Sequence, residues 1–146
     1  MRSPARAAVR AWAVDLLRRR AWAPLSVLGL HLFLSRVAGA YRALPDLDLP
    51  VHLLGGVAFS WFALGAAEGL ARRGLLGGPN RLALLGAAFL ATASAALFWE
   101  FAEFLSDRWL GTRAQGGLDD TLLDMAMGVA GSLLHLGGEA ARRRPA

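Results

Sequence analysis

Long apolar runs alternate with short polar segments that contain glycine or proline along most of this chain. The apolar runs cover residues 21–40, 51–70, 82–105 and 121–138. A helix of about 20 apolar residues is long enough to cross the hydrocarbon core of a bilayer. The pattern therefore predicts an all-α fold, an integral membrane bundle of about four transmembrane helices.

The composition agrees with this prediction, because 55% of the 146 residues are hydrophobic and the mean hydropathy is +0.41. We expect a basic cytoplasmic segment at 1–20 that lies on anionic lipid, a four-helix transmembrane domain at 21–138 and a basic cytoplasmic tail at 139–146. The sequence at 37–40 is compatible with signal-peptide cleavage, which would leave three spans. The long basic stretch before it and Arg36 favour retention of the first span.

Arginine is distributed unevenly between the predicted loops. Twelve of the 16 arginines flank the N-terminus, the loop at 71–81 or the C-terminus, and four lie in or near 41–50 and 106–120. Positive residues gather on the cytoplasmic side of membrane proteins. Both termini are therefore predicted in the cytoplasm. The basic excess is a topology signal rather than a nucleic-acid surface, so no nucleic-acid partner is expected.

Under this topology, eight of the eleven acidic residues fall on the outer side of the bundle, together with His52. These acids are Asp46, Asp48, Glu100, Glu103, Asp107, Asp119, Asp120 and Asp124. They come from three separate segments of the chain, so we expect them to gather at one end of the bundle.

The spacing of these residues strengthens the prediction. Glu100, Glu103 and Asp107 lie within roughly 60° of one another on a helix. The pair Asp120 and Asp124 and the pair Asp48 and His52 are both spaced i, i+4, so each pair shares one face.

Glu100 would lie roughly 10 Å deeper than Asp107 at about 1.5 Å per residue. An acid in the bilayer costs about 2.5–3.5 kcal/mol on insertion scales, so these side chains are predicted to face inward. Three kinds of chemistry fit: a cation bound by carboxylates and His52, a proton relay, or a structural network with Arg42, Arg108 and Arg113.

Other features receive simpler interpretations. His31, in the middle of the first span, is predicted as a hydrogen-bond partner between helices rather than a metal ligand. The pairs Gly56/Ser60 and Gly128/Ser132 have a small-xxx-small spacing, and packing within the bundle is favoured over a dimer face. The absence of cysteine excludes disulfides and thiolate metal sites. No P-loop, serine-hydrolase or zinc-protease motif is present.

Two stretches resemble a known family: "DLDLPVHLLGG" and "WEFAEFLSDRWLGTRAQGGLDDTLLDMAMGVAGSLL". They are similar to the small bacterial membrane proteins grouped around YjdF, which are distantly similar to VanZ-like proteins. The matching positions are Asp48 and His52, then Trp99, Glu100, Glu103 and Asp107, then Gly111, Gln115, Gly117, Asp120, Asp124, Gly128 and Gly131. The resemblance covers about residues 46–136 and implies a shortened bundle in a bacterial cytoplasmic membrane. It implies no activity, and the VanZ link suggests cell-envelope function by analogy alone.

The candidates for the polar site are then Asp48, His52, Glu100, Glu103, Asp107, Gln115, Asp120 and Asp124. The metal-ligand candidates are His52, Glu103, Asp107 and Asp124, with a divalent metal ion as the candidate cofactor. No catalytic residue can be assigned from the sequence.

The leading interpretation is a YjdF/VanZ-like integral membrane protein of unknown activity with an outward-facing His/carboxylate site. The alternatives are a metal-dependent membrane enzyme acting on a lipid or phosphate head group, a small proton- or cation-coupled transporter, and a structural partner subunit. The lipid bilayer is the expected partner in each case, and a homo-oligomer or a second membrane protein stays open.

Overall fold

The central helix is α4 (Asp48–Arg72), because each of the other long helices packs on it. These are α1 (Pro4–Arg20), α2 (Trp22–Leu32), α5 (Arg81–Leu110) and α6 (Leu118–Arg142). A π-helical turn (Phe33–Val37), the short α3 (Ala40–Ala43) and a 3₁₀ turn (Pro45–Leu47) connect α2 to α4. The computed structural model describes residues 4–142, except the side chains of Arg36, Arg42 and Pro45. Within those residues there is no strand, so the predicted all-α class is confirmed.

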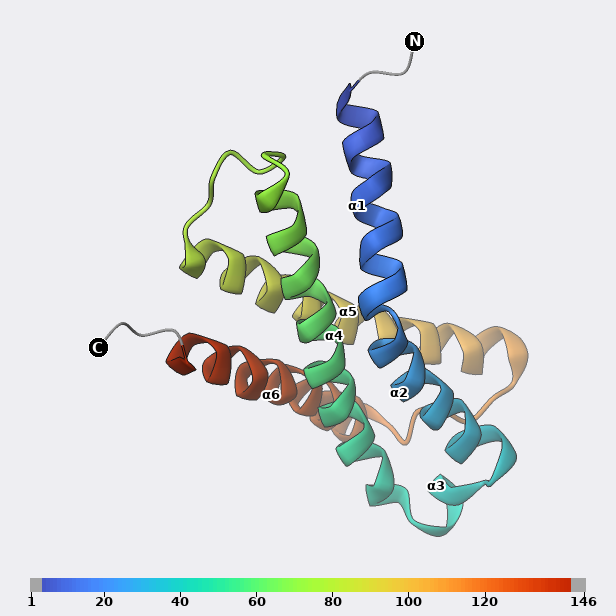
Figure 1. The fold of residues 1–146 in the computed structure, drawn as a ribbon. Helices are drawn as coiled ribbons and strands as arrows, with labels where there is room; N and C mark the ends of the chain where they lie inside the picture. The colour runs from blue at the N-terminus through green and yellow to red at the C-terminus, as the bar shows by residue number, and fades with distance from the viewer. Residues whose placement is uncertain (1–3, 143–146) are drawn as a thin grey trace.

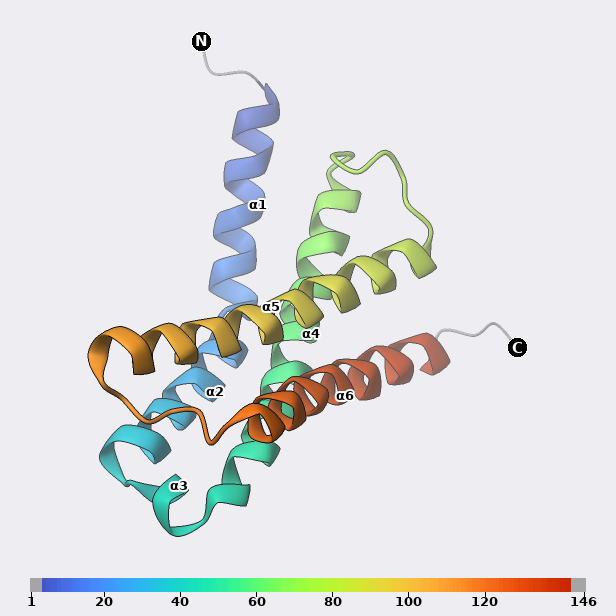
Figure 2. The same cartoon turned by 180° about the vertical axis from the view of Figure 1, so that it is seen from behind.

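The helices form two crossing groups (Figures 1 and 2). Helices α5 and α6 lie side by side, and α4 crosses both of them. Helix α1 packs on α4 as well, where the Trp12 indole donates to the Ala66 carbonyl at 3.0 Å. The Arg20 guanidinium donates to the Trp61 carbonyl at 2.8 Å and stacks over the Trp61 ring at 4.4 Å. The predicted segment 1–20 is therefore tied to the bundle, and its position on a lipid surface stays a prediction.

Two helices, α4 and α5, are long and apolar enough to cross a membrane. The span predicted at 21–40 is shorter, because α2 gives way to the π-helical turn and Gly39 adopts a left-handed conformation at φ +60°. The span predicted at 121–138 lies inside α6, where glycines and His135 lower the apolarity. The predicted tail begins within α6, and residues 143–146 lie outside the described residues.

The side chains inside and outside the bundle are distributed as expected for a membrane protein. The largest fully buried side chains are small or polar: Ser60, Thr92, Asp124 and Ser132. Large apolar side chains face outward instead, with Phe98 67% and Leu134 65% exposed. So many exposed large apolar side chains are unusual on a soluble monomer and are favourable against lipid.

Glycines bring α4 and α6 into close contact. A Cβ atom on Gly56 would collide with the backbone carbonyl of Gly128, and one on Gly131 would collide with the carbonyl of Leu53. Small residues at a helix interface allow such an approach. The predicted small-xxx-small pairs therefore pack inside the bundle, and they place the start of α4 against the start of α6.

An ion-pair cluster fastens the other end of the bundle. The Arg81 guanidinium lies 2.5 Å from Glu68 of α4 and 2.9 Å from Glu139 of α6. Since Arg81 begins α5, these two contacts join the start of α5 to the last turns of α4 and α6. The opposite ends of the same helices are left to form the site described next.

Candidate functional site

Six ionisable side chains from four helices meet at one end of the bundle, and we call them the His/carboxylate cluster. The members are His31 on α2, Asp48 and His52 on α4, Glu100 and Glu103 on α5, and Asp124 on α6. The helix directions explain the meeting, because α4 and α6 begin at this end while α2 and α5 end there. The spacings i, i+4 on α4 and i, i+3 on α5 keep each pair on one face.

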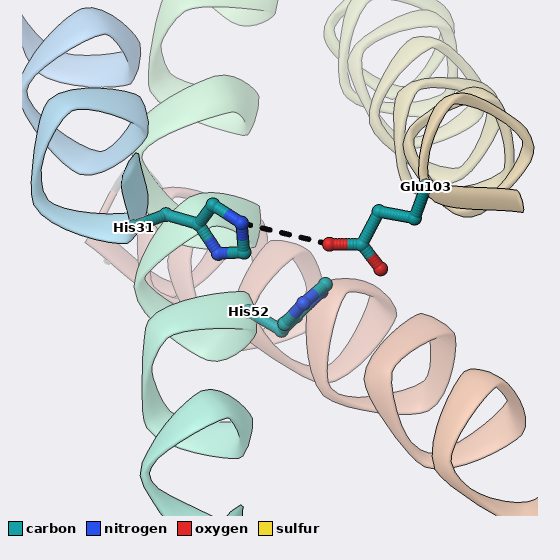
Figure 3. A group of neighbouring side chains, drawn as sticks. All are labelled: His31, His52 and Glu103. Carbon is teal, nitrogen blue, oxygen red and sulfur yellow. Dashed lines mark ion pairs between the residues drawn. The ribbon is translucent and has the colours of Figure 1, made fainter. Parts of the chain in front are cut away.

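The first half of the cluster surrounds His31. The Nδ1 atom of His31 lies 3.5 Å from Asp48 Oδ1, and its Nε2 atom lies 3.5 Å from Glu103 Oε1. Figure 3 shows His31, His52 and Glu103 approaching one another from α2, α4 and α5. One imidazole therefore faces a carboxylate on each of two other helices.

The second half surrounds His52. The Nε2 atom of His52 lies 3.5 Å from Asp48 Oδ1 and 3.9 Å from Asp124 Oδ1. Its Nδ1 atom lies 3.9 Å from Glu100 Oε1. Because hydrogen bonds of this kind are about 2.7–3.2 Å long, these atoms face each other without bonding directly.

Burial makes the missing bonds significant. Asp124 is 1% exposed, and its Oδ1 atom accepts no hydrogen bond from any described residue. The same holds for Asp48 Oδ1, His52 Nε2 and both carboxylate oxygens of Glu100. A buried polar atom without a partner costs about 1–3 kcal/mol, and more when charged. So many unpartnered buried atoms in one place indicate that a bound ion, proton or water completes the cluster.

Charge leads to the same conclusion. Among the side chains that the structure describes, the cations within 4 Å of the four carboxylates are His31 and His52, if they are protonated. Arg108 and Arg113, which the sequence offered as partners in a structural network, form no described ion pair with these acids, and the Arg42 side chain lies outside the described residues. The cluster therefore needs a bound cation or protons to balance its charge.

Two aromatic residues hold the cluster in place. The Trp99 indole donates to Glu103 Oε1 at 3.0 Å, and the Tyr41 hydroxyl lies 3.3 Å from His31 Nδ1. Burial, followed by the negative charge of Asp48, raises the pKa of Tyr41 well above its usual range. The hydroxyl thus keeps its proton and can act as a hydrogen-bond donor beside His31.

A cavity of about 930 Å³ opens directly onto the cluster, and we call it the polar cavity because charged and polar side chains are prominent in its lining. His31, Asp48 and Glu103 line its inner wall, and the loop at 111–117 lines its outer wall. A small polar molecule or a head group could therefore reach the cluster from this side.

Three of the residues predicted for the site build that outer loop instead of joining the cluster. Asp107 accepts hydrogen bonds from the Thr112 hydroxyl and from the backbone N–H groups of Ala114, at 2.8 Å, and Gln115, at 3.0 Å. Both of its oxygens are thereby committed to the loop, so the structure places Asp107 outside the proposed metal-ligand set.

The other two residues act in the same way. The Gln115 amide donates to the Glu100 carbonyl at 3.3 Å and to the Thr121 hydroxyl at 3.2 Å. Asp120 accepts from the Gly116 backbone N–H at 2.7 Å while lining the polar cavity. These contacts hold the loop in place as the outer wall of the polar cavity.

His31 is the member that the sequence analysis did not include. Its neighbours in the sequence are apolar, and no acid or histidine lies at a helical spacing from it. The one available signal was its position, since an ionisable residue inside a span is by default a candidate for a functional site.

Comparison with known families gives one result. Residues 17–144 match a family model described as "Predicted membrane protein (DUF2238)". This match confirms the resemblance to the YjdF-like proteins and contains every member of the His/carboxylate cluster. The link to VanZ-like proteins stays a prediction. No curated protein and no solved structure is significantly similar to the chain.

Proposed function

We propose that this chain, which belongs to the DUF2238 family of predicted membrane proteins, is a multi-pass membrane protein. We further propose that it binds a divalent metal ion in the His/carboxylate cluster. The observation that carries this proposal is the unpartnered Oδ1 atom of Asp124, buried beside His52 Nε2 and Asp48 Oδ1. An acid in this position is stable only when a cation or a proton shares the space.

The distances between the donor atoms favour a metal ion. Ligands about 2.0–2.1 Å from a tetrahedral zinc ion lie about 3.3 Å from one another. Asp48 Oδ1 and Asp124 Oδ1 lie 3.5 and 3.9 Å from the same His52 Nε2 atom, slightly longer than that value and too long for hydrogen bonds. A small inward movement would bring these three donor atoms around one ion.

Two sets of three ligands are close enough to hold an ion, and both include His52. One set is His31, His52 and Glu103, and the other is Asp48, His52 and Asp124. Since both sets include His52, they adjoin each other at this end of the bundle, and we refer to them together as the metal centre. Imidazole and carboxylate ligands without thiolate suit Zn²⁺, Mn²⁺ or Fe²⁺. Such an ion would polarise a carbonyl or phosphoryl oxygen and would acidify bound water.

The proposed setting is the bacterial cytoplasmic membrane, with four spans and both termini in the cytoplasm. The arginine distribution supports this topology, as do the outward-facing apolar side chains of α5 and α6. In this topology the cluster lies on the outer side of the membrane, which is compatible with a function in the cell envelope. In this arrangement α2, with the π-helical turn, and α6 cross the membrane together with α4 and α5.

The strongest rival is a proton- or cation-coupled transporter, which clustered carboxylates also support. Metal analysis of the purified protein separates the two. The wild type should contain a divalent metal in stoichiometric amount, and Asp124→Asn should lose most of it. Asp119→Asn, on the exposed side of the same helix, is the matched control and should keep it. Equal metal content in the wild type and Asp124→Asn would refute the proposal, and proton-driven flux in liposomes would then support the transporter.

A further inference from the structure

A second cavity meets the polar cavity at the cluster. It has a volume of about 450 Å³ and is lined mainly by apolar side chains of α2, α4 and α5. His31, Trp99 and Ala102 line both cavities. The polar and the apolar space are therefore adjacent, with the His/carboxylate cluster at their junction.

The apolar cavity runs from the cluster toward the middle of the bundle. On α5 it extends from Ala102 to Thr92, which is about 15 Å along the helix axis. Phe59 on α4 and Leu28 on α2 line the same space. This length and lining fit a hydrocarbon chain better than a polar molecule.

The apolar cavity is open to the lipid-facing surface. Phe98, which is 67% exposed, and Leu25, which is 60% exposed, both line the apolar cavity. Helices α2 and α5 both pack against α4, and the apolar cavity lies between α2 and α5. A chain could thus enter sideways from the bilayer without first crossing water.

The polar cavity supplies the complementary charge for a head group. Arg113 lines it and forms no described ion pair with an acid. The carboxylates of Asp48, Glu103 and Asp120 line the same cavity and would repel an anion. A bound divalent ion would offset this repulsion, so binding of an anionic head group should require the metal.

We propose that the two cavities bind one amphiphile, with a phosphate-bearing head group between the metal centre and Arg113 and its hydrocarbon tail between α2, α4 and α5. This inference rests on the proposed metal site. The bilayer itself is the source of such a molecule, and a free phosphate without a tail would occupy the polar cavity alone.

The test is binding of dodecyl phosphate to the full-length protein in a neutral steroid-based detergent, which has no alkyl chain to compete. Native mass spectrometry counts the bound molecules, and metal content is measured on the same sample. We expect one dodecyl phosphate per metal-loaded chain. Dodecanol, inorganic phosphate and the EDTA-treated protein should each show binding at least about tenfold weaker, since each lacks one of the contributing interactions.

Variants separate the head group from the tail. Ala95→Phe fills the apolar cavity and should reduce dodecyl phosphate binding about tenfold or more, whereas Ala91→Phe, one turn away on the exposed surface, should not. Arg113→Gln should weaken binding to a similar extent, and Arg108→Gln, which does not line the cavity, should have no effect. Normal metal content in each variant shows that the bundle is folded.

The outcomes distinguish the two proposals. A wild-type protein without bound metal would refute the proposed function, and this inference with it. A metal-loaded protein that binds no dodecyl phosphate would refute the inference alone. Inorganic phosphate binding as tightly as dodecyl phosphate, or Ala95→Phe binding like the wild type, would also refute it, because the tail would then contribute nothing.

Discussion

The Nδ1 atom of His31 lies 3.5 Å from Oδ1 of Asp48, so the end of α2 and the start of α4 direct polar atoms at one point. The two residues are separated by the π-helical turn, α3 and the 3₁₀ turn. This contact completes the wall of the His/carboxylate cluster that α4, α5 and α6 leave open. His31 is a proposed metal ligand because it lies within reach of His52 and Glu103 in one of the two ligand sets.

His31→Gln should therefore weaken metal binding, because it replaces an imidazole donor. We expect a loss at least as large as the roughly 10–100-fold that removal of an outer-shell partner costs. Tyr41→Phe is the comparison, because it removes only an outer-shell hydroxyl that lies 3.3 Å from His31 Nδ1 and should weaken binding to a smaller extent. Titration of the metal-free protein with Zn²⁺ and Mn²⁺ measures both affinities. Equal losses in the two variants would show that His31 acts as an outer-shell residue and does not bind the ion.

Metal binding should also stabilise the fold. A ligand that binds only the folded state adds about 2.7 kcal/mol at a hundredfold excess over its dissociation constant. Thermal melts in detergent should therefore rise when the preferred ion replaces EDTA, and the rise should shrink in Asp124→Asn. Zn²⁺, Mn²⁺, Mg²⁺ and Ca²⁺ are compared at equal concentration, with Asp119→Asn as the control. If no ion shifts the wild type more than Asp124→Asn, a proton relay or structural network becomes the leading explanation.

Gly56→Ala should destabilise the protein, because the added methyl group would meet the backbone of Gly128. Backbone cannot move aside as a flexible side chain can, so we expect a loss of about 1–3 kcal/mol in the free energy of unfolding. Gly86→Ala on α5 is the matched control, since nothing lies within 4 Å of its Cβ position. Helix propensity alone should make that variant neutral or slightly more stable. Denaturant titration in detergent measures both changes.

Helix periodicity predicted the composition of the cluster in part. The spacing of Asp48 and His52 and of Glu100 and Glu103 put each pair on one face, and the structure brings both pairs together with Asp124. Spacing describes one helix at a time, so it could not distinguish inward-facing acids near a helix end from acids that fold a loop. Asp107 shares the face of Glu103 but lies one turn nearer the loop, where backbone N–H groups are available.

The contribution of α2 could not be predicted in this way. His31 reaches the cluster through the path of the chain between α2 and α4, and no periodic pattern encodes that path. The four spans were likewise predicted from apolar length, which α4 and α5 satisfy. The apolar character of the α2 segment is interrupted where Gly39 turns the chain, and that interruption helps bring Tyr41 and Asp48 back toward His31.

The proposed topology can be tested with single cysteines, because the natural chain has none. Thr112→Cys should react with a membrane-impermeant maleimide in intact cells, since the loop at 111–117 is predicted outside. Ala140→Cys should react only after the membrane is opened. Labelling of both positions from the same side would contradict the topology and the outward orientation of the cluster.

The pH dependence of metal binding connects the cluster to its chemistry. Imidazole and carboxylate groups bind a metal only in their deprotonated forms, so the metal and protons compete for the same atoms. Affinity should therefore fall as the pH is lowered, because protons then compete with the metal for the imidazole and carboxylate atoms. With His31 and His52 both as ligands, the fall should be steeper than with one imidazole, and His31→Gln should flatten it. Titration with Zn²⁺ at several pH values, in wild type and His31→Gln, gives the two slopes. Affinity that does not change with pH would contradict binding by these imidazole and carboxylate groups, and parallel slopes would exclude His31 as a ligand.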